Sequence, residues 1–175
     1  MNYKTNNKGD YGEILVHKFL EQKGWVIYKP ITNAAHSFDR LAIKNKEKLI
    51  IAEVKSKATR IHYPDTGLDI KHYNIYKKIQ EKHNLDVYFF FVDEEKKEIY
   101  GGWLTELVKE CNIIHKNKML TYPLKQNGII YFPIDKMKKQ CDISDEDVEI
   151  LKSFTTKHER YKQEQDKVKQ VEIEW

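Results

Sequence analysis

Two segments of the chain carry apolar residues at the spacing of an amphipathic helix. In residues 10–23 an apolar stripe recurs every three or four positions, and Gly24 follows where a glycine commonly ends a helix. In residues 69–83 the apolar positions recur at intervals of three, at Ile70, Tyr73, Tyr76 and Ile79. These spacings predict two helices, each with one buried face.

Strand-forming residues fill four other segments. Residues 25–28 predict a short strand that ends before Pro30. Residues 38–44 and 48–55 predict two strands joined by a three-residue turn, so we expect a β-hairpin there. Residues 86–92 are apolar without alternation, which is typical of a strand that is buried on both faces.

The patterns in the rest of the chain are weaker. We expect a loop at 62–67, because Pro64 and Gly67 are turn-forming residues. Further along we expect a strand at 98–100, a short helix at 103–110, a strand at 129–132 and a polar helix at 144–165 with Ser144 as its N-cap.

Size and composition suit one compact domain with a charged surface, since the chain has 175 residues, 40% of them hydrophobic and 33% charged. We expect a disordered lead at 1–9, a core domain at 10–115 and a C-terminal extension at 116–175. The longest apolar run, 87–92, is far too short to span a bilayer, and the first residues lack the apolar segment of a signal peptide. The two cysteines form no CxxC pair. A cytoplasmic protein with free thiols and no membrane partner is therefore expected.

Charge is distributed unevenly along the sequence. The net charge of +4 divides into +8 for residues 1–141 and −4 for residues 142–175. Residues 44–83 are especially rich in lysine and arginine. A basic surface attracts polyanions such as nucleic acids, but lysine-rich segments are also common as ordinary solvated faces.

The predicted hairpin carries the candidate chemistry. If its turn is centred on Lys46, cross-strand partners are Ile43 with Leu49, Leu41 with Ile51, and Asp39 with Glu53. Directly opposed residues on one face have Cβ atoms about 5 Å apart. Two carboxylates would therefore lie side by side at the open mouth of an apolar ribbon, and a cation between them would relieve their repulsion. Carboxylate oxygens completed by water are what Mg²⁺ prefers.

Lys55 lies two residues after Glu53 and points to the same face. A lysine there could orient an attacking water or stabilise charge that develops on a phosphate. The Glu-x-Lys triplet by itself carries no information, because it recurs in the charged segment 94–97 and at the end of the first predicted helix. The other interpretation is that Glu53 and Lys55 mark the exit of a strand into solvent, with Asp39 opening the preceding strand.

These residues resemble the PD-(D/E)XK nuclease superfamily, which includes restriction endonucleases and archaeal-type Holliday junction resolvases. The resemblance is carried by Phe38-Asp39, by Ile51-Ala52-Glu53-Val54-Lys55 after a hairpin, and by Gly12-Glu13 on a preceding helix. It covers about residues 9–108, with Phe38 in place of the proline of the motif. It implies an α/β fold of the restriction endonuclease-like class, with a central mixed β-sheet flanked by helices in the order αβββαβ.

The resemblance also implies roles for individual residues. Asp39 and Glu53 would bind Mg²⁺, for which Mn²⁺ is a plausible substitute, and the carbonyl of Val54 would be a further ligand. Lys55 would assist the nucleophilic water. Glu13 would complete the metal site or hold a ligating water.

Glu13 also has an interpretation that needs no metal. Asp10-Tyr11-Gly12-Glu13 fits a capping box, with Asp10 as the N-cap of the helix and Glu13 three positions later. Gly12 fits both interpretations, because a residue without a side chain lets another backbone or a phosphate approach closely.

Several further residues are candidates for nucleic-acid contacts. Basic side chains that follow the hairpin could bind phosphates or could be ordinary solvated charges: Lys57, Arg60, His62 and Lys71. Tyr73 and Tyr76 on the second predicted helix could face the site or stack on bases, although their spacing favours core packing.

The sequence therefore predicts a Mg²⁺-dependent nuclease that hydrolyses phosphodiester bonds of DNA, as an endonuclease of restriction, repair or junction-resolving type. RNA as the substrate and a homodimeric state both remain open. The alternative is a catalytically silent nucleic-acid-binding or interaction module on the same fold.

Overall fold

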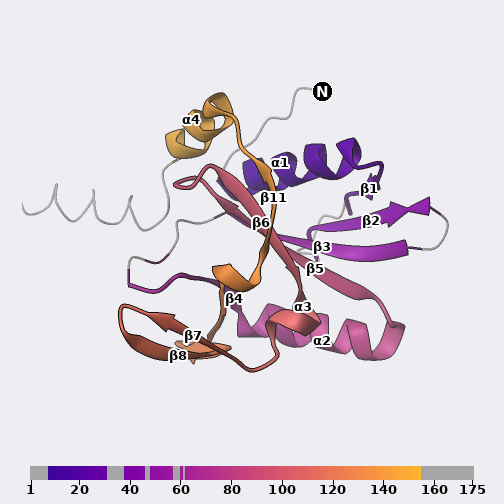
Figure 1. The fold of residues 1–175 in the computed structure, drawn as a ribbon. Coiled ribbons are helices and arrows are strands. Elements are labelled where there is room, and N and C mark those ends of the chain that lie inside the picture. The colour runs from indigo at the N-terminus through magenta and orange to yellow at the C-terminus, as the bar shows by residue number, and fades with distance from the viewer. Residues whose placement is uncertain (1–7, 31–37, 46–47, 57–59, 61, 155–175) are drawn as a thin grey trace, which may run out of the picture.

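The computed structural model describes residues 8–30, 38–45, 48–56, 60 and 62–154. Its centre is a six-stranded sheet in the order β1-β2-β3-β5-β6-β11 (Figure 1). The strands of this sheet are β1 (Val26–Tyr28), β2 (Arg40–Lys44), β3 (Lys48–Ser56), β5 (Asp86–Asp93), β6 (Glu98–Trp103) and β11 (Lys138–Asp142). Among these strands β3 and β5 run parallel, while the other neighbours are antiparallel.

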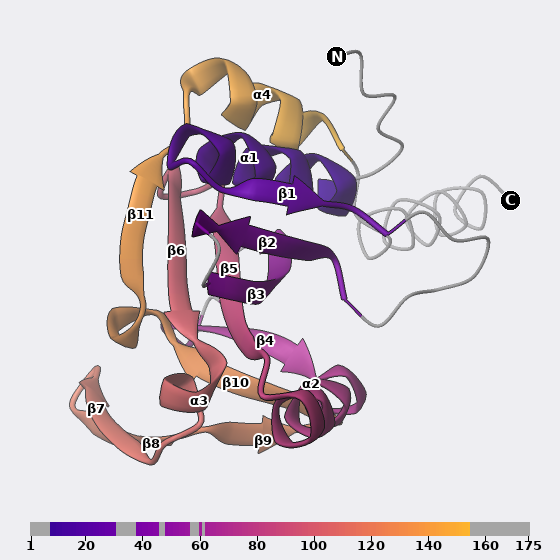
Figure 2. The ribbon, with the colours of Figure 1, turned by 90° about the vertical axis from the view of Figure 1, so that its right-hand side faces the viewer.

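Helices cover both faces of the central sheet (Figure 2). On one face lie α1 (Lys8–Gln22) and α4 (Asp145–Ser153), and on the other lies α2 (Ile70–His83). A mixed sheet between helices in this order is the fold class that the sequence predicted. Between β3 and α2 the chain forms an additional strand, β4 (Asp65–Asp69), which belongs to a different sheet.

The alternation of side chains along β3 and β5 divides the core into two parts. Ala52 and Val54 of β3 pack toward α1 with Phe90, whereas Ile51 packs toward α2 with Phe89. Because β5 lies between two paired strands and both of its faces are covered, its side chains from Phe89 onward are almost completely buried. This explains the continuous apolar run that predicted a strand buried on both faces.

The prediction of a loop at 62–67 was wrong for its second half, because β4 begins at Asp65. This strand pairs with β10 (Ile129–Pro133), which the sequence had predicted, and β10 also pairs with β9 (Leu124–Gln126). Gly67 lies within β4 rather than in a turn, and its lack of a side chain lets β10 pack closely against it. A Cβ on Gly67 would lie 2.6 Å from Ile129 Cγ2, which is closer than carbon atoms can approach. The sequence pattern gave Gly67 as a turn residue, because nothing near it in the sequence shows that β10, some sixty residues later, packs against it.

Beyond β6 the structure differs more from the expected elements. The helix expected at 103–110 is a single turn, α3 (Leu104–Leu107). It is followed by an unpredicted hairpin of β7 (Cys111–His115) and β8 (Lys118–Tyr122). The strand expected at 98–100 continues to Trp103, and β11, which was also missed, pairs with it at the sheet edge.

Both ends of the chain extend beyond the described residues. Of the lead expected at 1–9, residues 8 and 9 already belong to α1, and the others lie outside the described part. Of the helix expected at 144–165, α4 accounts for the first part, with Ser144 as the predicted N-cap, and the part after residue 154 lies outside. Strand pairings join residues on both sides of position 115, at which the sequence suggested that an extension begins. No helix in the described segments is long and apolar enough to cross a membrane.

Candidate active site

The β2–β3 hairpin has the register that the sequence predicted. Leu41 pairs with Ile51 and Ile43 pairs with Leu49, and the first pair of β2 is Arg40 with Ala52. Asp39 immediately precedes that pair, so it lies at the open mouth of the ribbon next to Glu53. The carboxylate of Asp39 accepts a hydrogen bond of 2.8 Å from the backbone N–H of Val54, which fixes it at this position.

Glu53 is buried at the centre of the site, with only 1% of its surface exposed. One carboxylate oxygen lies 2.5 Å from the Lys55 ammonium, and the other accepts a hydrogen bond from the hydroxyl of Tyr76 on α2. Burial and the negative charge of Asp39 raise the pKa of Glu53 to about 7, although Lys55 and Tyr76 act in the opposite direction. An additional positive charge at this position would therefore be stabilising.

Lys55 faces carboxylates on more than one side. Burial lowers the pKa of Lys55, but its contact with Glu53 and the charges of Asp39 and Asp69 raise the pKa above its ordinary value overall. The ammonium group is therefore charged near neutral pH. A fixed positive charge beside paired carboxylates can orient a water molecule or stabilise the negative charge of a phosphate in a transition state.

Glu13 reaches the same region from α1, on the other side of the sheet. Its carboxylate forms an ion pair of 2.7 Å with Arg40, whose guanidinium also donates a hydrogen bond of 2.7 Å to the carbonyl oxygen of Asp39. Burial and the charge of Asp39 raise the pKa of Glu13, and Arg40 and Lys29 offset this only in part. Glu13 is thus linked to Asp39 through Arg40, and whether it also holds a metal-bound water stays a prediction.

The capping-box interpretation of Glu13 was wrong, because α1 begins at Lys8 and Asp10 lies inside its first turn. The close approach expected at Gly12 is real. A Cβ at Gly12 would lie 2.6 Å from the Cβ of Ser56 at the end of β3. This tight contact places the start of α1 against the end of β3, which brings Glu13 toward the hairpin mouth.

Two of the residues that complete the site were missed or underestimated from the sequence. Arg40 is only 2% exposed and holds Glu13 and Asp39 together. Its place at the start of β2, directly after Asp39, was the available signal for it. Tyr76 is buried in the core, as its spacing predicted, yet its hydroxyl reaches Glu53. Nothing in the spacing indicates where that hydroxyl points.

The basic residues proposed for phosphate contacts lie in different environments. Lys57 is outside the described residues. His62 and Lys71 are exposed to solvent, the latter in the first turn of α2. Lys71 and His62 therefore remain available for contacts with a polyanion.

Arg60 has partners within the protein. Its guanidinium pairs with the buried carboxylate of Asp65 at 2.6 and 2.7 Å and stacks on Tyr131, 3.7 Å from the ring centroid. Asp65 also accepts a hydrogen bond of 2.9 Å from the hydroxyl of Tyr122. Arg60 thus connects the segment before β4 to the second sheet, and a phosphate contact would have to share it with Asp65.

The donor set at the hairpin mouth fits a hard divalent cation. Among the described residues no group of three or more His, Cys, Asp or Glu side chains is arranged as a metal site. Mg²⁺ does not require such a group, because it keeps several waters and commonly takes only one or two protein carboxylates. Asp39 and Glu53 could supply these, and the buried carboxylate of Glu53 is the feature that a cation would compensate.

Comparisons with solved structures find nucleases among the similar proteins. The protein is similar to Hjc, a Holliday junction resolvase from Archaeoglobus fulgidus, with a TM-score of 0.48 and 11% identity over 73% of this chain and 94% of that chain. It is also similar to the bacterial homing endonuclease I-Ssp6803I, with a TM-score of 0.42 and 15% identity over 73% of this chain and 80% of that chain. The resemblance inferred from the sequence names nucleases of the same kind. No family model and no curated protein matches the sequence.

Proposed function

We propose that this protein is a metal-dependent nuclease that hydrolyses phosphodiester bonds of DNA. One observation carries the proposal. The almost fully buried Glu53 lies beside Asp39 at the mouth of a β-ribbon and contacts the charged amine of Lys55 at 2.5 Å. Two carboxylates and a lysine in this arrangement supply the metal ligands and the positive charge that phosphodiester hydrolysis requires.

In this mechanism Asp39 and Glu53 would hold Mg²⁺, or Mn²⁺ in its place, with the carbonyl of Val54 as a further ligand. The metal would polarise the phosphate and lower the pKa of the attacking water. Lys55 would orient that water and neutralise charge on the phosphate. Tyr76 would hold the carboxylate of Glu53, and Glu13 would hold Asp39 in place through Arg40.

Basic residues around the site would bind the DNA backbone. Lys57, His62 and Lys71 follow the catalytic strand or begin the next helix, and Arg60 would contribute if it can contact phosphate while paired with Asp65. A homodimer would bring two such sites together for cleavage of both strands. RNA is the alternative substrate, because contacts to phosphates do not distinguish the two nucleic acids.

The test is a cleavage assay on four substrates, namely supercoiled plasmid, linear duplex, single strands and a four-way junction, with Mg²⁺, with Mn²⁺ and with EDTA. Asp39→Asn and Glu53→Gln remove the negative charges and keep the side-chain shapes. Both are expected to abolish cleavage of whichever substrate the wild type cuts. Glu106→Gln, on the exposed surface of α3, is the matched control and should leave cleavage unchanged. Unchanged cleavage by both site variants would refute the mechanism.

One observation favours the silent module as the second candidate. Both carboxylate oxygens of Glu53 already have protein partners, as in a purely structural ion pair. Titration of Mg²⁺ into the protein by calorimetry separates the candidates. A nuclease should bind Mg²⁺ and lose that binding in Asp39→Asn, whereas a silent module would bind none.

A further inference from the structure

A concave surface lies at the other end of the hairpin from the candidate active site, on the face of the central sheet that α1 covers. It is a cavity of about 380 Å³, within the range of about 300–1,000 Å³ that is usual for small-molecule sites. Ile50 and Phe90 form part of its floor and belong to the core on the α1 side. Glu53 contacts α2 on the opposite face. The cavity is therefore separate from the candidate active site, and we refer to it as the α1-side pocket.

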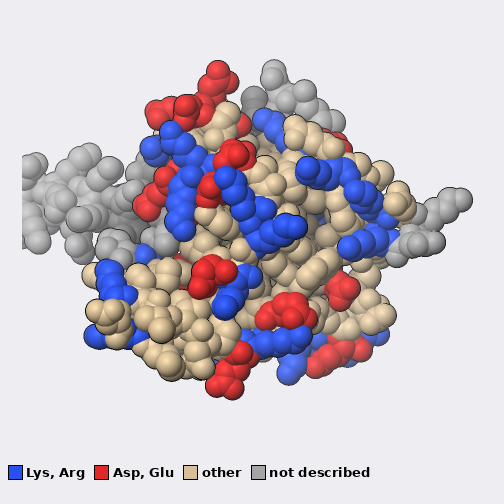
Figure 3. All heavy atoms as spheres, viewed as in Figure 1, with Lys and Arg blue, Asp and Glu red and all other residues tan. Residues whose placement is uncertain are grey.

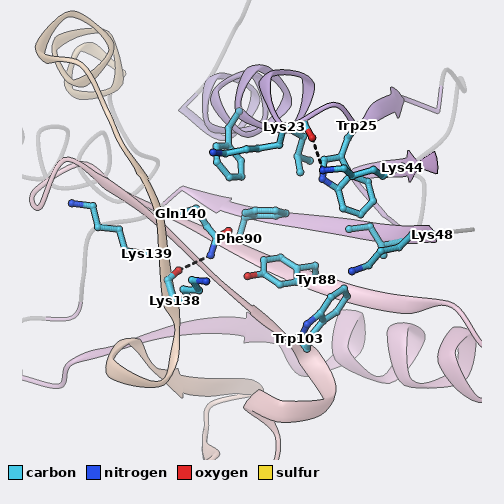
Figure 4. Close-up of a pocket in the computed structure, with 13 residues that line it drawn as sticks. Lys23, Trp25, Lys44, Lys48, Tyr88, Phe90, Trp103, Lys138, Lys139 and Gln140 are labelled. Atoms are coloured by element: carbon cyan, nitrogen blue, oxygen red, sulfur yellow. Dashed lines mark hydrogen bonds between the residues drawn. The ribbon is translucent and has the colours of Figure 1, made fainter.

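Lysines surround the α1-side pocket. Five of them line it, and none of its described lining residues is acidic: Lys23, Lys44, Lys48, Lys138 and Lys139. Figure 4 shows them on two sides, with the β11 lysines facing those that come from α1 and the hairpin. In the space-filling view of Figure 3, Lys and Arg side chains lie around an uncharged area on this face.

Most of these lysines have no carboxylate partner in the described part of the chain. Lys139 is the exception, because it pairs with Glu98 at 2.6 Å and with Asp142 at 2.7 Å. The described residues provide no ion pair for Lys48, Lys138 or Lys23. Uncompensated lysines that converge on one hollow repel one another, so binding of an anion there would be favourable.

Aromatic rings form the other part of the pocket. Tyr88 lies between the two groups of lysines, and Trp25 and Trp103 lie on the side of Lys44 and Lys48 (Figure 4). The Lys48 ammonium lies 5.0 Å from the ring centroid of Trp103 and 5.9 Å from that of Trp25. A half-buried indole within reach of a lysine offers both a stacking surface and a positive charge.

We propose that the α1-side pocket binds one nucleotide of a single-stranded nucleic acid segment, with the base against the aromatic rings and the adjoining phosphates on the lysines. A nucleotide combines a planar ring with a strong anion, which matches the two kinds of side chain present. A base within a duplex is stacked on its neighbours and cannot offer its face, so the ligand must be unpaired at this point. An acidic peptide would satisfy the lysines but would leave the indole faces unused.

Binding can be measured through the tryptophans of the pocket. The chain has three tryptophans, so a Trp175→Phe variant retains only Trp25 and Trp103, and both of them line the pocket. Hexathymidylate is titrated in EDTA at low salt, and quenching of the fluorescence is followed. An abasic hexamer with the same phosphates and a hexaglutamate peptide serve as the comparison ligands.

We expect hexathymidylate to bind at least about fivefold more tightly than the abasic hexamer, because stacking of a base on an aromatic side chain contributes on the order of 1–3 kcal/mol. Hexaglutamate should bind more weakly still. Equal affinities for the hexathymidylate and the abasic hexamer, or equal binding of the peptide, would overturn the proposal by showing a site for anions in general.

Charge-reversal variants locate the binding. Lys48→Glu and Lys138→Glu change exposed side chains and should weaken hexathymidylate binding at least about tenfold. Lys118→Glu, an equally exposed lysine on β8, should change it less than twofold. Equal losses in all three variants would overturn the assignment to this pocket. The assay excludes divalent metal, so its outcome is independent of whether the site at Asp39 cleaves DNA. Failure of the nuclease proposal would appear separately, as cleavage unaffected by Asp39→Asn.

Discussion

The hydroxyl of Tyr76 allows a direct test of what sets the pKa of Glu53 in the candidate active site. It donates a hydrogen bond to the carboxylate of Glu53 and so lowers the pKa of Glu53, which burial and Asp39 nevertheless raise to about 7. Tyr76→Phe removes only this oxygen and keeps the ring in the core. A hydrogen bond to a charged group contributes about 1.5–3 kcal/mol, and one pKa unit corresponds to about 1.4 kcal/mol.

The expected pKa of Glu53 in Tyr76→Phe is therefore at least about one unit higher than in the wild type. At pH 7 the ionised fraction of Glu53 would fall from about one half to about one tenth. Only the ionised carboxylate binds metal, so we expect about a fivefold loss of Mg²⁺ affinity at pH 7 and nearly full recovery at pH 9. Tyr76 is in this sense a positioning residue, and its effect should follow pH.

The assay measures Mg²⁺ affinity by calorimetry between pH 6 and pH 9, together with cleavage of the preferred substrate. Tyr100→Phe is the matched control, because Tyr100 also donates to a glutamate, Glu98, away from the site. It should leave both profiles unchanged. A loss of the same size at pH 7 and pH 9 in Tyr76→Phe would refute the reasoning, because it would reduce Tyr76 to a packing role.

Two further predictions concern the candidate active site, and two concern the packing of β4. Lys55→Met should lower cleavage at least about tenfold while Mg²⁺ binding persists, and loss of the metal in calorimetry would contradict the role given to its amine. Without metal, the free energy of unfolding of the wild type should fall by about 3 kcal/mol as pH rises from about 4.5 to 7, because the buried Glu53 binds its proton more tightly in the folded state. In urea unfolding, the stability of Glu53→Gln should depend less on pH than that of the wild type. Gly67→Ala should reduce the free energy of unfolding by about 1–3 kcal/mol through its clash with Ile129, and an unchanged urea midpoint would contradict the packing described. Asp65→Asn should reduce the free energy of urea unfolding by about 2 kcal/mol, since it removes the negative charge and one of the two oxygens that accept from Arg60.

Patterns of apolar and polar residues over short stretches of sequence determined the main helices and strands of the core. The hairpin register followed from alternation and a short turn, so the sequence by itself predicts Asp39 beside Glu53. The two long helices and the buried strand β5 were determined in the same way, because helical and strand periodicities arise within a few consecutive residues. The α/β order of the core was therefore available from the sequence.

Pairing between distant segments was decided only in three dimensions. The sequence gives no local signal that β4 will be covered by β10, or that β11 will extend the central sheet beside β6. The same holds for the hydroxyl of Tyr76 on Glu53 and for the α1-side pocket, which several segments build together. Periodicity shows which face of a helix or strand is buried, but which other element covers that face depends on the packing of the whole chain. The contacts that set the pKa of Glu53, such as the hydroxyl of Tyr76, therefore exist only in the folded protein.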